Sequence, residues 1–446
     1  MSQDTPPQID SFEPTRRREA LEAQAPLARQ NPTGQNVNMH FHSFFSYNGQ
    51  GWSPSHIAVE ARQAGLYAAG LCDFDVLDGM EEFLSAGRLL GLRTAVFLET
   101  RAYLAEFGDK DINSPGEPGV AYSMGAGFVR RPEPGSEQAR TLEQLRSAAR
   151  SRNEQLIERI NRKLQNLNID YQTDVIPLAP SGNATERHIV SAYVDSAAKL
   201  FPGQALEGFW GMVLAADAAD VRDLLADRTA LEEKVRSRLA KRGGLGYVQP
   251  SAETFPPMET FYSWVASCDA IPMIAWLDGT SQGEADPEAL FTCQVEMGAE
   301  ALNIIPDRNW NFSDADKATK MADNLDLCVK TARKLNLPIN IGTEMNKPGL
   351  PFVDDLAGPV LSRYADDFRT GAEIMVGHTT ASLYANVSYV SDKARSQWPD
   401  KADRNAFFAS IGALEPVDDD LHDKLLQAGP EKAFQIISDA ADEGRW

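Results

Sequence analysis

Along residues 37–101, short continuous apolar runs alternate with stretches in which apolar residues recur at helical spacing. Short apolar runs predict strands at Val37–His42, Tyr67–Cys72 and Thr94–Leu98. Between these runs, apolar residues recur at helical spacing, and each helical stretch ends at a glycine. A repeat of strand, helix and strand is typical of parallel β/α folds.

The same alternation returns after a long interruption. Further strands are predicted at Ile271–Trp276, Ala301–Ile305 and Pro338–Ile341. The interruption consists of helical stretches, most of them charged, at Ser136–Leu167, Glu186–Leu200 and Val221–Arg242. We therefore expect an α/β fold, a distorted (β/α)7-type TIM-like barrel over residues 37–355, with a helical insertion at about 103–250.

The two flanks of this barrel have no β/α repeat. Residues 1–36 are polar and rich in proline and glutamine, which predicts a flexible or disordered arm with one short helix around Arg17–Ala25, stopped by Pro26. Residues 356–446 contain helical stretches and no candidate chemistry, and His378 there is interpreted as a surface or packing residue. We expect this C-terminal extension to pack on the barrel or to form an oligomer contact.

Each of the first three predicted strands ends in polar side chains. His40 and His42 end the first, Asp73 follows the second, and Glu99 ends the third. Side chains two residues apart on a strand point to the same side, and the carboxyl ends of parallel strands meet at one rim. Imidazole is the commonest protein metal ligand, so this rim is a candidate metal site.

The order and spacing of these residues resemble a known family. The chain has His40-Phe41-His42-Ser43, Ala64-Gly65-Leu66, an Asp-x-Asp-x-x-Asp-Gly segment from Asp73, and Gly91-Leu92 before the strand that ends in Glu99. This is similar to the opening of the PHP (polymerase and histidinol phosphatase) superfamily. The resemblance implies a metal-dependent hydrolase of phosphate esters, with His40, His42, Glu99 and Glu344 as the metal ligands that this chain retains.

Other positions depart from the family pattern. Where the family has further ligands, this chain has Tyr47 or Asn48, Phe74, Tyr122, Trp276 and Asn346. Phenyl and indole rings cannot coordinate a metal, so we expect one divalent metal (Zn, Mn or Fe) or none.

The resemblance also suggests residues that would act on a substrate. Asp73 or Asp278 would serve as the catalytic base. Arg187 and His188, in the insertion, would bind an anionic group of the substrate. Trp276 could stack on a sugar or ring, and Arg308 is a further candidate contact.

The composition and net charge limit the classes of binding partner that we expect. The net charge of −21 argues against a broad basic face for nucleic acid. No run of 18 apolar residues predicts a membrane helix, and the four cysteines show no paired metal spacing. We expect a cytoplasmic protein with a small-molecule substrate or ligand and with no nucleic-acid or membrane partner, and homo-oligomer formation stays open.

Three functions remain compatible with the sequence. The first is a metal-dependent, phosphoesterase-like hydrolase of a small polar substrate, phosphorylated or sugar-like, with a reduced single-metal site. The second is a catalytically inactive PHP-scaffold protein that binds a small ligand or a protein partner. The third is a structural subunit of a complex. The retained His-x-His pair favours the first, and the lost ligands favour the second.

Overall fold

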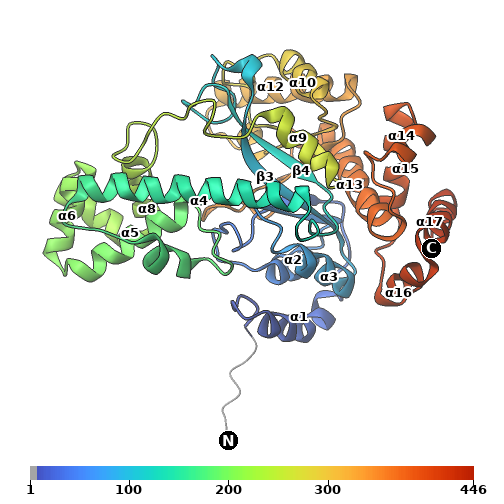
Figure 1. Ribbon diagram of the computed structural model, residues 1–446, viewed down its shortest axis with the longest axis horizontal. Helices are drawn as coiled ribbons and strands as arrows, with labels where there is room; N and C mark the ends of the chain where they lie inside the picture. Colours follow the sequence, from blue (N-terminus) through green and yellow to red (C-terminus); the bar gives the residue numbers. More distant parts are fainter. Residues whose placement is uncertain (1–7) are drawn as a thin grey trace, which may run out of the picture. The chain divides into compact units, whose positions relative to one another are not determined.

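The computed structural model describes residues 8–446, which form two compact units (Figure 1). The first unit contains the residues up to Ser43, then Asn48–Thr141 and Ala252–Trp446. The second contains Phe44–Tyr47 and Leu142–Ser251. The second unit starts later than the expected insertion, because the strand that follows Glu117 belongs to the barrel.

The first unit is built on one seven-stranded sheet. Its strands are β1 Val37–Phe41, β2 Ala68–Phe74, β3 Arg93–Tyr103, β4 Val120–Ala126, β5 Ile271–Trp276, β6 Ala301–Ile304 and β7 Ile339–Ile341. They pair in sequence order, and all pairs are parallel except those of β4, which runs antiparallel to β3 and β5. Every strand is almost fully buried, as expected where both faces of the sheet are covered.

The sheet closes between β1 and the residues after β7. The backbone N–H of His42 donates to the carbonyl of Glu344 at 2.8 Å, and the N–H of Glu344 donates to the carbonyl of His40 at 2.8 Å. Glu344 has a positive φ of 62°, which turns the chain toward β1 at this point. The first unit is therefore a distorted TIM-like barrel, as the strand and helix pattern predicts.

Helices cover the outside of this sheet. They are α2 Pro54–Gln63, α3 Met80–Leu90, α9 Met258–Ser267, α10 Pro287–Glu296, α11 Asp307–Trp310 and α12 Ala315–Lys334, with a short helix, η1, at Ala105–Phe107. The hydroxyl of Ser53 accepts from the backbone N–H of His56 and caps α2. Gly91, with a left-handed backbone, ends α3.

A helix precedes the barrel, and it is longer than the short helix expected around Arg17–Ala25. Helix α1, Pro14–Ala28, packs on α2 and α3 (Figure 1). Arg17 is buried and donates to the carboxylate of Glu82 at 2.6–3.0 Å. The sequence predicted that the helix would stop at Pro26, but Pro26 lies inside α1. The sequence did not predict the ion pair between Arg17 and Glu82, because an arginine in a polar stretch usually indicates a solvent-exposed face.

The C-terminal extension packs on the barrel through one long helix. It comprises η4 Leu361–Tyr364, α13 Ala365–Ala385, α14 Asp392–Gln397, α15 Lys401–Ala413, α16 Asp419–Ala428 and α17 Pro430–Glu443. Gly371 lets α13 approach β7 so closely that a Cβ there would lie 1.9 Å from the carbonyl oxygen of Ile339. Gly377 and Gly412 allow a similarly close crossing of α13 and α15.

The second unit is helical. Its helices are α4 Glu137–Leu164, of which the part from Leu142 belongs to this unit, α5 Glu186–Leu200, α6 Gln204–Leu214, α7 Ala218–Ala226 and α8 Arg228–Leu239, with short helices η2 Tyr171–Val175 and η3 Ile176–Leu178. Trp210 and Tyr193 are fully buried in its core. The single helix expected over Val221–Arg242 is two helices, because Asp227 ends α7 and its carboxylate caps α8.

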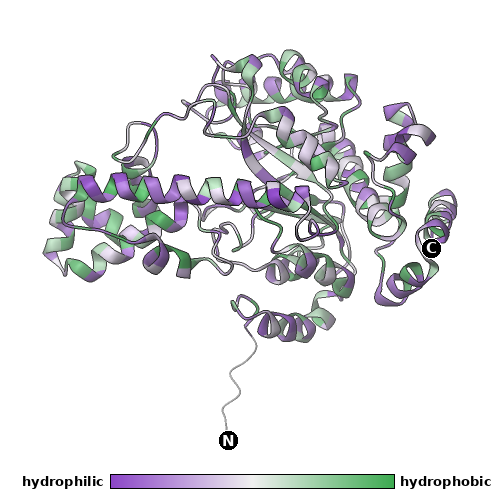
Figure 2. Cartoon of the chain, in the orientation of Figure 1, coloured by the Kyte–Doolittle hydropathy of each residue, from purple (hydrophilic) through white to green (hydrophobic). Residues whose placement is uncertain are grey.

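The helices carry many hydrophilic residues. Figure 2 shows hydrophilic residues along most of α4. Across residues 8–446, no helix is both long enough and apolar enough to cross a lipid bilayer.

Candidate metal centre

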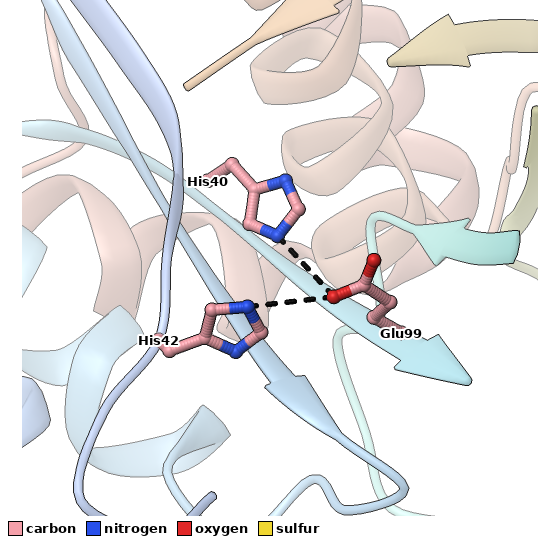
Figure 3. A group of neighbouring side chains, drawn as sticks. All are labelled: His40, His42 and Glu99. Carbon is pink, nitrogen blue, oxygen red and sulfur yellow. Dashed lines mark ion pairs between the residues drawn. The ribbon is translucent and has the colours of Figure 1, made fainter. Parts of the chain in front are cut away.

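The ends of β1 and β3 bring two imidazoles and one carboxylate together. His40 Nε2 lies 3.6 Å from Glu99 Oε2, and His42 Nε2 lies 3.4 Å from the same oxygen (Figure 3). The two histidines point the same way because they are two residues apart on an extended chain. One ligand atom from each of the three residues lies within 4.8 Å of the others. This geometry follows directly from the His-x-His pattern and the strand-end position of Glu99.

These three side chains are buried, and among the described residues two of them have polar atoms without a hydrogen bond. His40 and His42 are 0% exposed, and Glu99 is 3% exposed. Within residues 8–446, neither ring nitrogen of His40 nor Oε2 of Glu99 has a hydrogen-bond partner. Buried polar atoms are normally hydrogen-bonded, so a cluster of unpaired ones needs an explanation such as an ion.

The electrostatics of the cluster favour positive charge. Burial alone would lower the pKa of His40, but the carboxylates of Glu99 and Glu344 and the amide of Asn303 outweigh it and raise that pKa. Burial would also raise the pKa of Glu99, yet the two imidazoles hold it below its ordinary value. A divalent cation between these groups would supply the charge that the site stabilises.

The donor set fits a transition metal. Two imidazole nitrogens and one carboxylate oxygen are the protein ligands of catalytic zinc sites that leave a position open, and the same donors hold non-haem iron. His40, His42 and Glu99 are all buried, so little solvent reaches their ligand atoms. The residues present therefore match a single divalent metal with open coordination positions.

Aromatic side chains lie beside the cluster. The ring of Phe74 stacks on His42, with centroids 4.5 Å apart and an interplanar angle of 17°. The ring centroid of Tyr122, on β4, lies 6.1 Å from the ring centroid of Phe74. Over residues 8–446, the His40, His42 and Glu99 group is the only close cluster of three or more possible metal ligands.

Glu344, the fourth expected ligand, is outside that close group. Its backbone closes the barrel against β1, and its partly buried carboxylate contributes to the raised pKa of His40. Its assignment as a direct metal ligand stays a prediction.

The two expected catalytic bases have other partners. Asp73 is 2% exposed and accepts from the backbone N–H and the hydroxyl of Ser43, at 2.8 and 2.7 Å. Phe74 pairs with Glu99 in the β2–β3 register, so Asp73, one residue earlier, lies on the opposite face. Asp278 accepts from the backbone N–H and the hydroxyl of Thr280, a turn interaction. The structure therefore shows Asp73 and Asp278 shaping loops and does not bring them to the metal ligands.

Trp276 and Arg308 also lie away from the cluster. In the β5–β6 register Trp276 is opposite Ile304, while Ala275 is opposite Asn303, the residue that faces His40. Alternation therefore directs the indole to the outer face of the sheet, where it packs near Gly279. Arg308 is exposed on α11.

Arg187 and His188 begin α5 in the second unit. Arg187 forms an ion pair with Glu233 at 2.7 Å, and its guanidinium lies 5.5 Å from the ring centroid of Tyr47. His188 Nδ1 accepts from the backbone N–H of Thr185, and burial lowers the pKa of His188 to about 4. Their predicted role in binding a substrate anion stays a prediction.

Sequence reasoning missed several buried polar residues of the barrel. Asn38, Asn303 and Asn340 are each 0–1% exposed, inside strands β1, β6 and β7. Glu284 is 1% exposed, and its carboxylate accepts from the backbone N–H groups of Leu277, Asp278 and Gly279. An asparagine in the middle of a short apolar strand is the pattern that could have identified the first three.

Comparisons with known proteins give weak similarities. No protein-family model matches the chain, and no curated protein sequence matches it. An amidohydrolase from Chromobacterium violaceum is 17% identical, with a TM-score of 0.48 over 74% of this chain and 96% of that one. A predicted metal-dependent phosphoesterase from Bifidobacterium adolescentis is 18% identical, with a TM-score of 0.45 over 75% of this chain and 98% of that one. The fold assignment therefore rests on the strand order and closure of this chain itself.

Proposed function

We propose that the chain is a metal-dependent hydrolase with a PHP-like barrel and one divalent metal at His40, His42 and Glu99. The observation that carries the proposal is the buried group itself, in which His40 and Glu99 have unpaired atoms and the charges favour a cation. The resemblance of the His-x-His segment and the following strands to the PHP superfamily supports the same reaction class.

Each part of the site has a distinct task in this proposal. A bound metal would acidify a water molecule or polarise an acyl or phosphoryl oxygen. His40 and His42 would hold it from one strand, and Glu99 would supply the negative charge from another. Phe74 and Tyr122 would keep the adjacent volume apolar and restrict the site to one metal. The finer substrate assignment is a small polar molecule, phosphorylated or sugar-like.

Elemental analysis of the purified protein tests this proposal. We expect about one transition metal per chain in the wild type after incubation with Mn²⁺ or Zn²⁺. His42→Ala should lose this metal, because it removes one of three ligands. His422→Ala is a matched control, since His422 pairs with Tyr384 on the C-terminal helices, away from the three ligands.

Activity is measured on the same three proteins with phosphate monoesters, amides and sugar esters. Turnover that is lost together with the metal in His42→Ala, and retained in His422→Ala, supports a hydrolase. Metal without turnover of any of these substrates would favour the ligand-binding scaffold. No metal in the wild type would refute the proposed site.

A further inference from the structure

Three amide side chains lie inside the barrel beside His40. Asn38 is two residues before His40 on β1, Asn303 is on β6 and Asn340 is on β7. Asn303 and Asn340 are register partners, so their side chains share one face of the sheet. An amide buried in an apolar core costs stability unless it is hydrogen-bonded, so three of them in one place suggest a specific use.

Hydrogen bonds tie these amides to the backbone of β1. Asn340 Nδ2 donates to Asn303 Oδ1 at 2.8 Å and to the carbonyl of Met39 at 3.3 Å. Asn38 Oδ1 accepts from the backbone N–H of His40 at 3.1 Å. The amides of three strands thus fix the position of the chain on either side of the first imidazole.

Two buried atoms on this side of the site lack a partner. Within the part of the chain that the structure describes, His40 Nδ1 and Asn340 Oδ1 have no hydrogen bond. Asn303 is close enough to influence the charge of His40. The unpaired groups are thus complementary, because a protonated Nδ1 is a donor and an amide oxygen is an acceptor.

A histidine that binds a metal through one nitrogen carries its proton on the other. His40 Nε2 is the nitrogen that faces Glu99, so the proton must lie on Nδ1 when a metal is bound. Ligating histidines normally donate this second N–H to a carboxylate or a carbonyl, which fixes the ring and its tautomer. Asn303 and Asn340 each have an amide oxygen that can accept such a proton, and the amide of Asn303 contributes to the raised pKa of His40.

We propose that Asn303 and Asn340 are positioning residues that accept the Nδ1 proton of His40 and so aim Nε2 at the metal position. This inference rests on the proposed metal site and adds two residues to it. It also explains why two short apolar strands each contain a buried asparagine.

Zinc affinity of variants at Asn303 tests the proposal. The dissociation constant for Zn²⁺ is measured by competition with a colorimetric chelator on the full chain. Asn303→Leu keeps the approximate volume and removes the acceptor, so affinity should fall about 10- to 100-fold. Asn303→Asp keeps an acceptor and should bind Zn²⁺ at least as tightly as the wild type.

A matched control separates positioning from a general packing loss. Gln294, on α10, is also a buried amide, and its Oε1 accepts from the hydroxyl of Tyr262 on the outer side of the sheet. Gln294→Leu should leave zinc affinity within about twofold of the wild type. If Asn303→Leu does not fold, Asn303→Ala removes the acceptor with a smaller side chain and is measured in the same way.

A spectroscopic readout reports the proton itself. In the Zn²⁺-loaded chain labelled with ¹⁵N-histidine, the Nδ1 proton of His40 should give a slowly exchanging downfield NMR signal. The signal should persist in Asn303→Asp and be lost or shifted upfield in Asn303→Leu. A merely structural asparagine would not produce this split between the two variants.

The failures of the two proposals are distinguishable. If the wild type binds Zn²⁺ and the two Asn303 variants bind it equally well or equally poorly, the positioning role is wrong while the metal site stands. If the wild type binds no metal at all, the proposed function fails, and the positioning role fails with it.

Discussion

A buried histidine on α13 should make the barrel unit sensitive to acid. His378 is 0% exposed, its Nε2 bonds the carbonyl of Gly127 after β4 at 3.0 Å, and its Nδ1 accepts from the backbone N–H of Tyr389 at 3.0 Å. Both nitrogens are thus used in the neutral form. A second proton on Nδ1 would face an N–H donor, and burial lowers the pKa of His378 to about 4.

The sign and size of the effect follow from linkage. A folded-state pKa below the ordinary value of 6.5 contributes stability above pH 6.5 that is lost as the pH falls through 4. At about 1.4 kcal/mol per pH unit, the loss between pH 7.5 and pH 5.0 is about 2 kcal/mol. Other groups also titrate in this range, so the effect is isolated by comparison with a variant.

His378→Gln provides that comparison. Glutamine retains a donor and an acceptor but cannot gain a proton. It should be less stable than the wild type at pH 7.5, and this deficit should shrink by about 2 kcal/mol at pH 5.0. Urea unfolding followed by circular dichroism measures both proteins at both pH values. A deficit that is the same at both pH values, within about 0.5 kcal/mol, would refute the reasoning, as would an NMR titration of His378 near pH 6.5.

Three further changes test the packing around the barrel. Gly371→Ala should destabilise the barrel by about 1–3 kcal/mol in urea unfolding, because the new Cβ would overlap a carbonyl oxygen of β7, and an unchanged midpoint would contradict this close approach. Arg17→Ala should cost about 2 kcal/mol, measured in the same way, because it leaves the mostly buried carboxylate of Glu82 without its cation, and Arg17→Lys should recover part of the loss. Asp354 accepts from the indole of Trp310, and burial raises the pKa of Asp354 to about 7, so its stabilising contribution is present below pH 3.8 and is lost as the pH rises through 7. Asp354→Asn should therefore gain stability relative to the wild type between pH 4 and pH 8, and a constant difference in unfolding free energy would argue against a protonated carboxyl.

The barrel could be predicted because local patterns decide it. Buried parallel strands produce short apolar runs, and the polar residues at their ends mark the rim, which is why His40, His42 and Glu99 were found together. The strand of Trp276 was predicted, but the side of the sheet that its indole faces depends on pairing with β6. Register of this kind is a property of the whole sheet and is not visible in one strand.

The C-terminal helix α13 illustrates a second limit. It is buried around most of its circumference, so it lacks the one-sided apolar stripe that identifies a surface helix. Its glycines lower helix propensity, yet they are what allow the backbone to lie against β7 and α15. The sequence therefore predicted helical stretches in residues 356–446 without defining the bounds of this helix.

The seam of the barrel has a consequence for the lifetime of the protein. The two hydrogen bonds that join β1 to the residues after β7 use the backbone of His40 and His42, whose side chains form the proposed metal site. Opening the seam would therefore pull the two imidazoles away from Glu99, and a cation held by all three would resist that opening. The concentration of available metal would then set how often the chain opens locally at residues 342–346. When the metal is depleted, local opening would expose this segment to proteases before the whole protein unfolds.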